Sequence, residues 1–191
     1  MSTLKVNAIE KKDADQTLTV KDATLTGATS LTGTTTLTSP TVADMSNFTF
    51  PAGMVIQVVQ NTVSTEKTDS SNTWVADDLY VNITPFKASS KILIQMIAGF
   101  YQGSGGRCFW NIYESVAGGT YTPVVSTGSG LGVAQTEGGG GWNVSYLASP
   151  SYTVGQQLSY RLYFQTFNSV AVQMRNSTLE TNVAIAMEIA G

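Results

Sequence analysis

The stretch Asn182-Val183-Ala184-Ile185-Ala186-Met187-Glu188-Ile189-Ala190 decides the fold class, because large and small side chains alternate along it. Successive side chains of a β-strand point to opposite faces. One face therefore carries Val183, Ile185, Met187 and Ile189, and the other carries Ala184, Ala186, Glu188 and Ala190. A face exposed to solvent would be expected to carry mainly polar side chains, whereas this small face is mainly apolar. The pattern therefore predicts a strand that is covered on both sides.

The same alternation recurs along the preceding sequence, between clusters of Gly, Pro, Asn and Ser that favour turns. The expected strands are 54–60, 74–84, 91–101, 107–114, 121–126, 142–148, 158–167, 170–176 and 182–190. No segment shows a sustained helical period. Together these strands predict an all-β head, a jelly-roll-like antiparallel sandwich of two sheets.

Several of these strands carry a second face that is aromatic and partly polar. In strand 158–167, Leu158, Tyr160, Leu162 and Phe164 oppose Arg161, Tyr163, Gln165 and Phe167. In strand 107–114, Cys108, Trp110 and Ile112 oppose Phe109, Asn111 and Tyr113. Aromatic residues and arginine are enriched in subunit interfaces, so we interpret the second face as a contact between subunits. The alternative is a wider sandwich with ordinary exposed tyrosines.

A short repeat precedes the head. Leu25-Thr26-Gly27-Ala28-Thr29-Ser30 is followed by Leu31-Thr32-Gly33-Thr34-Thr35-Thr36 and by a degenerate third copy, Leu37 to Val42. Sparse leucines cannot form a core within one chain, whereas three chains around one axis can stack them. We therefore expect a trimeric β-stem with Leu25, Leu31, Leu37 and Val42 inside it. The alternative is a disordered linker rich in Ser and Thr.

The distribution of charge divides the chain into three segments. Residues 1–22 hold eight of the 23 charged residues, whereas residues 23–65 hold only Asp44. We expect a particle-attachment segment over 1–22, the repeat stem over 23–50 and the jelly-roll head over 51–191. A net charge of −3, with no basic run longer than Lys11-Lys12, argues against nucleic acid as a partner.

The residue types that are missing exclude much of enzyme chemistry. The 191 residues contain no histidine, which removes Ser-His-Asp and Cys-His catalysis and histidine-ligated metal sites. The sole cysteine, Cys108, lies in an alternating strand and is expected to be a small core residue rather than a catalytic thiol. The N-terminus lacks the apolar region of a signal peptide, and no apolar run is long enough to span a bilayer. We expect no enzyme activity, no cofactor and no membrane insertion.

Acidic residues give no strong metal or catalytic pattern. Asp77 and Asp78 are adjacent, so in a strand they point to opposite faces and cannot act as a glycosidase pair. In a loop they are expected to be solvated, with a Ca²⁺ site as the alternative. Glu188 is expected to pair with Arg161 or Arg175 at a subunit contact.

The best candidates for binding a host surface lie near the glycine run 138–141. Trp142, Tyr146 and Tyr152 follow it, and aromatic rings at a loop can stack on sugars. The alternative is a mobile loop beside a core tryptophan.

Three stretches carry a resemblance to a known group of proteins. Met1-Ser2-Thr3-Leu4-Lys5-Val6-Asn7 resembles the opening of marine and cyanobacterial phage fibre proteins. Residues 51–60, from Pro51-Ala52-Gly53 to Gln60, resemble the start of their C-terminal head, and residues 82–94 resemble its second and third strands. The resemblance implies a homotrimer, an N-terminal attachment to other virion proteins and an outward-facing head. The run Gly138–Gly141 has no counterpart in that pattern.

These observations predict a virion structural protein, assembled in the host cytoplasm. It would be a short trimeric, tail-fibre-like protein whose head contacts host surface glycans. The alternative is a capsid decoration or head-fibre protein that binds no receptor. A glycan-degrading tailspike is the enzymatic alternative, and it would require a close pair of carboxylates in a groove.

Overall fold

A computed structural model describes residues 48–126, 128–135, 137–175 and 182–191. The expected attachment segment and nearly all of the expected stem, with Leu25, Leu31, Leu37 and Val42, lie outside the described residues.

The described part of the chain forms strands and no helix. The strands are β1 (Val55–Val63), β2 (Lys67–Asp69), β3 (Val75–Ile83), β4 (Lys91–Gln102), β5 (Arg107–Val116), β6 (Thr122–Pro123), β7 (Gly132–Ala134), β8 (Gly138–Ala148), β9 (Leu158–Phe167), β10 (Val172–Arg175) and β11 (Asn182–Ile189). Each long strand that the sequence predicted is present, with its ends shifted by a few residues. The short strands β2 and β7 were not predicted, because three residues are too few to show an alternation.

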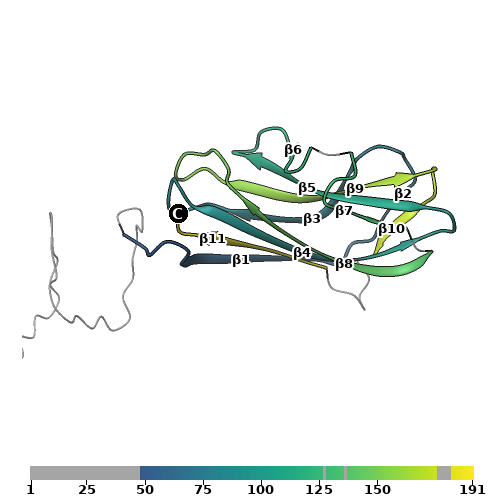
Figure 1. Cartoon of the computed structure of the whole chain (residues 1–191), viewed down its shortest axis with the longest axis horizontal. Coiled ribbons are helices and arrows are strands. Elements are labelled where there is room, and N and C mark those ends of the chain that lie inside the picture. Colours follow the sequence, from purple (N-terminus) through teal and green to yellow (C-terminus); the bar gives the residue numbers. More distant parts are fainter. Residues whose placement is uncertain (1–47, 127, 136, 176–181) are drawn as a thin grey trace, which may run out of the picture. The chain divides into compact units, whose positions relative to one another are not determined.

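The strands form two antiparallel sheets that pack face to face (Figure 1). In the first sheet, here sheet A, β1 pairs with β11, β11 with β4, and β4 with β8. Beyond the end of β11, β10 pairs with β4, and β2 pairs with β10. In sheet B, β3 pairs with β9 and β9 with β5, and β6 and β7 extend the edge beyond β5. The prediction of an all-β, two-sheet sandwich is confirmed.

The core lies between the two sheets and draws large side chains from both. Sheet B contributes Leu79, Leu162 and Phe164, and sheet A contributes Ile94 and Met96, all of them buried. Cys108 is also fully buried, as expected of a core residue, and burial raises the pKa of its thiol to about 12. A thiol with so high a pKa is a poor nucleophile.

Strand β11 faces the core with its small side chains. Ala184, Ala186 and Glu188 are fully buried, whereas Val183, Ile185, Met187 and Ile189 are only half-buried on the outer side of sheet A. The sequence pattern did not decide which side of this strand faces inward, and the structure places the small side in the core. The physical reason is packing across the sandwich, because β11 lies against β3, which fills the core with the buried side chains of Leu79, Val81 and Ile83.

The glycine run 138–141 is the first part of strand β8, and the expectation of a loop there is wrong. Gly138, Gly139, Gly140 and Gly141 pair in register with Gln102, Tyr101, Phe100 and Gly99 of β4. A Cβ atom on Gly140 would lie 2.9 Å from the ring of Phe100. Glycine is needed there because aromatic rings of the core fill the space that a side chain would occupy.

Candidate functional site

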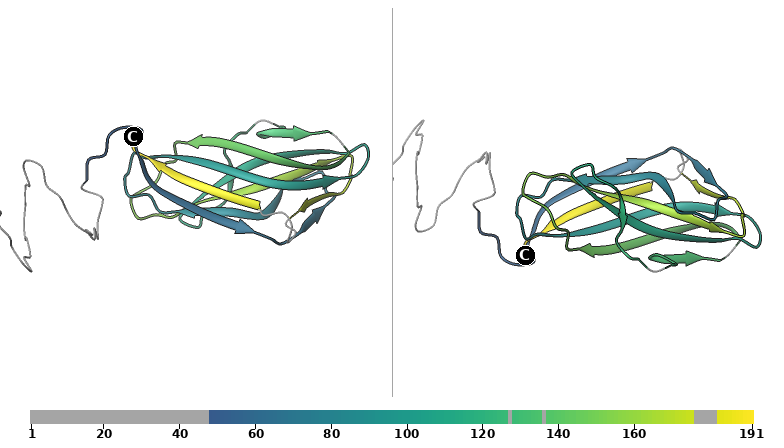
Figure 2. Two further views of the ribbon diagram at one scale, coloured as in Figure 1. Left: turned by 90° about the horizontal axis from the view of Figure 1, so that it is seen from below. Right: turned by 90° about the horizontal axis from the view of Figure 1, so that it is seen from above.

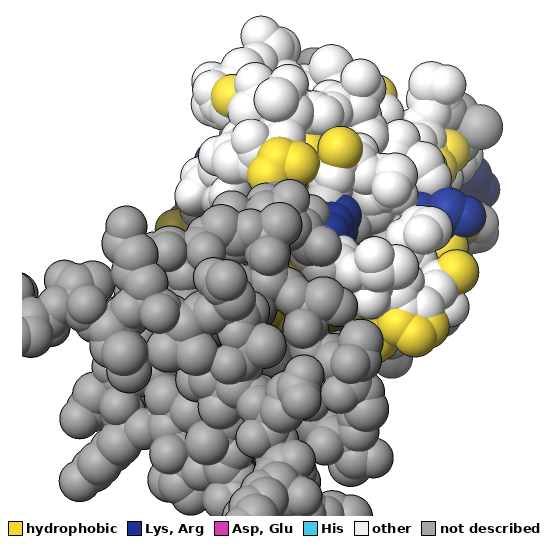
Figure 3. Space-filling model, turned by 90° about the vertical axis from the view of Figure 1, so that its left-hand side faces the viewer, with side chains coloured by type: hydrophobic (Ala, Val, Ile, Leu, Met, Phe, Trp, Pro, Cys, Tyr) yellow, Lys and Arg dark blue, Asp and Glu magenta, His cyan; other side chains and the backbone are white. Residues whose placement is uncertain are grey.

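The chain enters and ends at the same pole of the sandwich. The N–H of Gly53 donates to the carbonyl of Ala190 (2.9 Å), and the N–H of Ala190 donates to the carbonyl of Met54 (2.8 Å). We call this end, with residues 48–54, 84–90, 149–157 and 190–191, the proximal pole. Loops 70–74, 103–106 and 168–171 lie at the opposite, distal pole (Figure 1). Figure 3 looks onto the proximal pole, where most visible described side chains are uncharged.

A buried carboxylate holds the proximal pole together. Glu188 is fully buried, and its side chain accepts hydrogen bonds from the N–H groups of Phe86 (3.0 Å) and Lys87 (3.1 Å). It also accepts from Ser90 Oγ (2.6 Å) and Gln57 Nε2 (2.7 Å). Glu188 thus joins β1, β11 and the loop before β4, and the expected pairing with an arginine at a subunit contact is wrong. A single acid in a row of alanines is the feature of the sequence that marks such an internal anchor.

Tyr152 belongs to the same pole and has a structural partner. Its hydroxyl donates to the carbonyl of Lys87 and lies 3.5 Å from the carbonyl of Ser90. Burial raises the pKa of this tyrosine. Tyr152 therefore fastens the loop 149–157 to the loop that Glu188 organises.

Trp142 lies inside the sandwich. It is 4% exposed and stacks between Phe100, at 4.6 Å between ring centroids, and Trp110, at 4.3 Å. A ring stacked on both sides has no face left for a sugar. The sequence left open whether Trp142 stacks on sugars or lies in the core, and the structure places it in the core.

Tyr146 lines a shallow, mainly polar cavity of about 210 Å³, together with Glu114, Thr122 and Ser149. Its hydroxyl donates to the carbonyl of Val124 at 3.2 Å. Trp142, Tyr146 and Tyr152 thus occupy the core, this cavity and the proximal pole, and they do not form one aromatic surface.

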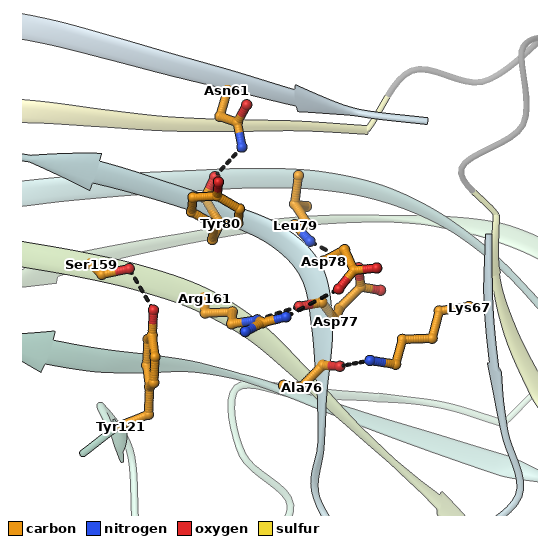
Figure 4. Close-up of polar contacts among 10 residues, drawn as sticks. All are labelled: Asn61, Lys67, Ala76, Asp77, Asp78, Leu79, Tyr80, Tyr121, Ser159 and Arg161. Carbon is orange, nitrogen blue, oxygen red and sulfur yellow. Dashed lines mark hydrogen bonds and ion pairs between the residues drawn. The ribbon is translucent and has the colours of Figure 1, made fainter. Parts of the chain in front are cut away.

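The acidic pair lies in strand β3 rather than in a loop (Figure 4). The pairing of β3 with β9 is irregular between Ala76 and Tyr80, where Asp77 is fully buried. Asp77 Oδ1 accepts from the N–H of Leu79 (2.9 Å), and Oδ2 has no hydrogen-bond partner among the described residues. Burial raises the pKa of the Asp77 carboxyl. The expectation of solvated loop acids is wrong for Asp77.

Asp78 faces the outside of sheet B and pairs with an arginine. Arg161 Nη2 lies 3.1 Å from Asp78 Oδ1, and Arg161 Nε donates to the carbonyl of Asp77 (Figure 4). Within the described ranges, no three His, Cys, Asp or Glu residues gather as metal ligands. The described residues also include no helix suited to crossing a bilayer.

The outer face of sheet B is aromatic, as the sequence predicted for strands 107–114 and 158–167. Tyr113 and Tyr163 stack with ring centroids 3.9 Å apart, and Trp74 lies 6.2 Å from Tyr113. Tyr121 reaches over from the segment after β5, and its hydroxyl shares a hydrogen bond of 2.6 Å with Ser159 Oγ. The chain therefore covers part of this face itself.

The distal pole is polar and its loops are fastened to each other. Asn72 Nδ2 donates to Ser169 Oγ (3.2 Å), and the N–H of Ser169 donates to Asn72 Oδ1 (3.1 Å). Asn168 and Ser169 both have positive φ, at 62° and 56°. Non-glycine residues keep this backbone conformation only where their surroundings hold it. Sequence reasoning missed this pole, because the contacts join residues almost a hundred positions apart.

Comparison with known proteins leaves the family open. No family model matches the chain, and no curated protein is similar to it in sequence. Among solved structures, a chain from a structure of infectious bursal disease virus, Gx strain, is similar at a TM-score of 0.41 and 11% identity. The alignment covers 72% of this chain and 33% of that one. A likeness of this degree carries no argument about function.

Proposed function

We propose that this chain is a structural protein of a bacteriophage particle. In this proposal it is a short trimeric, tail-fibre-like protein, in which residues 1–22 attach to other virion proteins and residues 23–50 form the stem. The head projects from the stem and does no catalysis. The resemblance of residues 1–7, 51–60 and 82–94 to phage fibre proteins supports the proposal.

The observation that carries the proposal is the position of both ends of the head at one pole. A domain whose chain enters at the proximal pole can be fixed there while the opposite pole stays free. The order β1-β11-β4-β8 against β3-β9-β5-β6, in which the long strands alternate between the two sheets along the chain, supports a jelly roll. Jelly rolls are common in viral structural proteins, which agrees with the proposal.

In the fibre-like form of the proposal, host contact is made by the distal pole. Its loops point away from the attachment end, and loops at the end of a sandwich commonly carry recognition. The hydrogen bonds between Asn72 and Ser169 hold two of these loops in a fixed relation. Three heads on one stem would present three such poles together, so weak individual contacts with host glycans would add up.

The alternative is a capsid decoration protein that binds no receptor. The burial of Trp142 favours it, because the predicted aromatic platform for sugars is not formed.

Immunogold labelling of purified particles tests the proposal. Antibody against the head should label the outside of the particle, at the tail for a fibre-like protein or over the shell for a decoration protein. Particles that contain none of this chain would refute both forms. Excess soluble full-length chain should compete with particles for adsorption to host cells if the head binds a receptor, and should have no effect if it only decorates the shell.

A further inference from the structure

The outer face of sheet A carries a continuous apolar row across four strands. In register, Leu147 of β8 pairs with Leu93 of β4, Leu93 with Met187 of β11, and Met187 with Val58 of β1. Val58 is 58% exposed and Leu147 is 50% exposed. We call these four residues, with Ile97 and Ile185 beside them, the apolar row. The left view of Figure 2 looks onto these strands, which lie side by side.

This face has almost no charge. Along the outer sides of β1, β11, β4 and β8, Lys91 is the single charged residue, and it lies at the proximal end of β4. The other outer residues are apolar or are neutral amides, hydroxyls and glycines, such as Gln95, Ser145 and Thr62. An apolar surface of this kind on a soluble domain marks a contact site. Cores of subunit interfaces are likewise poor in charge.

We propose that the apolar row is the surface through which the heads of neighbouring copies of this chain pack together. The apolar row itself carries no charged residue, so it can meet a copy of itself without burying an unpaired charge. β1 is the edge strand of this sheet, and the described residues 48–54 lead into it from the side of the expected stem. Stems that join the copies would therefore hold the apolar rows of neighbouring heads close to each other, which raises the effective concentration of one row around the next.

This inference rests on the proposed function for its tether, since residues 23–50 are there the stem that holds the copies together. The packing of the heads is nevertheless a separate event. The heads could remain apart although the stem forms a trimer. They could also pack together although the protein is not part of a virion. The test must therefore report on the face itself as well as on the mass of the assembly.

The rate at which Met187 is oxidised shows whether the face is covered, because oxidation of methionine depends on access to its sulfur. Full-length protein should sediment as an oligomer and react slowly with hydrogen peroxide at Met187. Met54, which is 46% exposed, serves as the accessible reference, and the buried Met96 serves as the protected one. Peptide mass spectrometry measures the three rates in one sample.

The double variant Val58→Glu/Leu147→Glu should separate the heads. Both side chains are exposed, so the sandwich can still fold, and circular dichroism checks that it does. We expect head association to weaken by at least about tenfold, because each contact would bury unpaired carboxylates, and oxidation of Met187 to become several-fold faster. Val154→Glu is the matched control, since Val154 is 43% exposed but lies in the loop 149–157, and it should leave both results unchanged. If the double variant does not fold, Ile97→Glu replaces it.

Three results would overturn the inference. A monomer with protected Met187 would mean that the chain's own preceding residues cover the face. An oligomer in which Met187 is oxidised as fast as in the double variant would mean that assembly uses another surface. A monomer with accessible Met187 would leave the face to a different protein. The variant Leu31→Asp, which alters only the expected stem, should lower the affinity between copies but keep Met187 protected at high protein concentration.

Discussion

The two outer faces of the sandwich differ in what covers them. On sheet B, Tyr121 lies against Tyr163 and bonds to Ser159, and Arg161 pairs with Asp78, so polar groups and aromatic rings find partners within the chain. On sheet A, within the part of the chain that the structure describes, Leu147 and Val58 at the two ends of the apolar row are exposed, and Leu93 and Met187 between them are half-buried. Among the described residues, the segment after β5 that partly covers sheet B has no equivalent over the apolar row of sheet A. Sheet B also has exposed apolar side chains, namely Tyr80, Val133 and Phe167, but the continuous apolar row across four paired strands belongs to sheet A.

The largest effect is expected from replacing Glu188, which is buried on the core-facing side of β11 in sheet A. Glu188→Ala would leave the N–H groups of Phe86 and Lys87 without their acceptor, and we expect unfolding to become easier by roughly 3–5 kcal/mol. Urea denaturation of the full-length protein measures the change. Glu188→Gln keeps one acceptor oxygen and should cost less, whereas Glu137→Ala, at an exposed position, should cost almost nothing. Equal stability of Glu188→Ala and wild type would contradict the anchoring role.

A smaller effect is expected from reversing the size pattern of β11. Ala186→Leu adds volume to the closed core and should destabilise the head by about 1–3 kcal/mol. Met187→Ser, at the next position on the outer side, should change the stability of the head by less than about 1 kcal/mol. Denaturant midpoints at one low protein concentration compare the two variants. The opposite ranking would mean that the large side chains of β11 face the core.

The smallest effect, and the one that changes with pH, is expected at Asp77, on the core-facing side of strand β3 in sheet B. Burial raises the pKa of Asp77 above its value in the unfolded chain, so folding favours the protonated carboxyl. Asp77 therefore opposes folding at neutral pH, and the penalty disappears as the pH falls below the unfolded pKa of about 4. Asp77→Asn should stabilise the head by roughly 1 kcal/mol at pH 7 and by nothing near pH 3. Thermal melts across this range measure the difference, and a gain that did not depend on pH would argue against a charged Asp77.

The sequence predicted the strands well where alternation is long and its two sides differ in size. β9 is an example, because Leu158, Tyr160, Leu162 and Phe164 can only face a core. It failed at the glycine run 138–141, since glycine has no side chain and shows no alternation. It also failed for the candidate binding residues. Trp142 and Tyr152 are close in sequence, but pairing of β8 with β4 places one inside the sandwich and the other beyond its proximal end.

Sequence alone determined that this chain builds strands, that the head has two sheets, and that histidine-dependent chemistry is excluded. These conclusions follow from side-chain period and residue types, which are local properties. Only the tertiary structure decided which side of β11 faces inward, what Glu188 binds, and which outer face carries the apolar row. Each of these depends on the volume and hydrogen-bonding groups supplied by strands distant in sequence, and a pattern within one strand does not contain them.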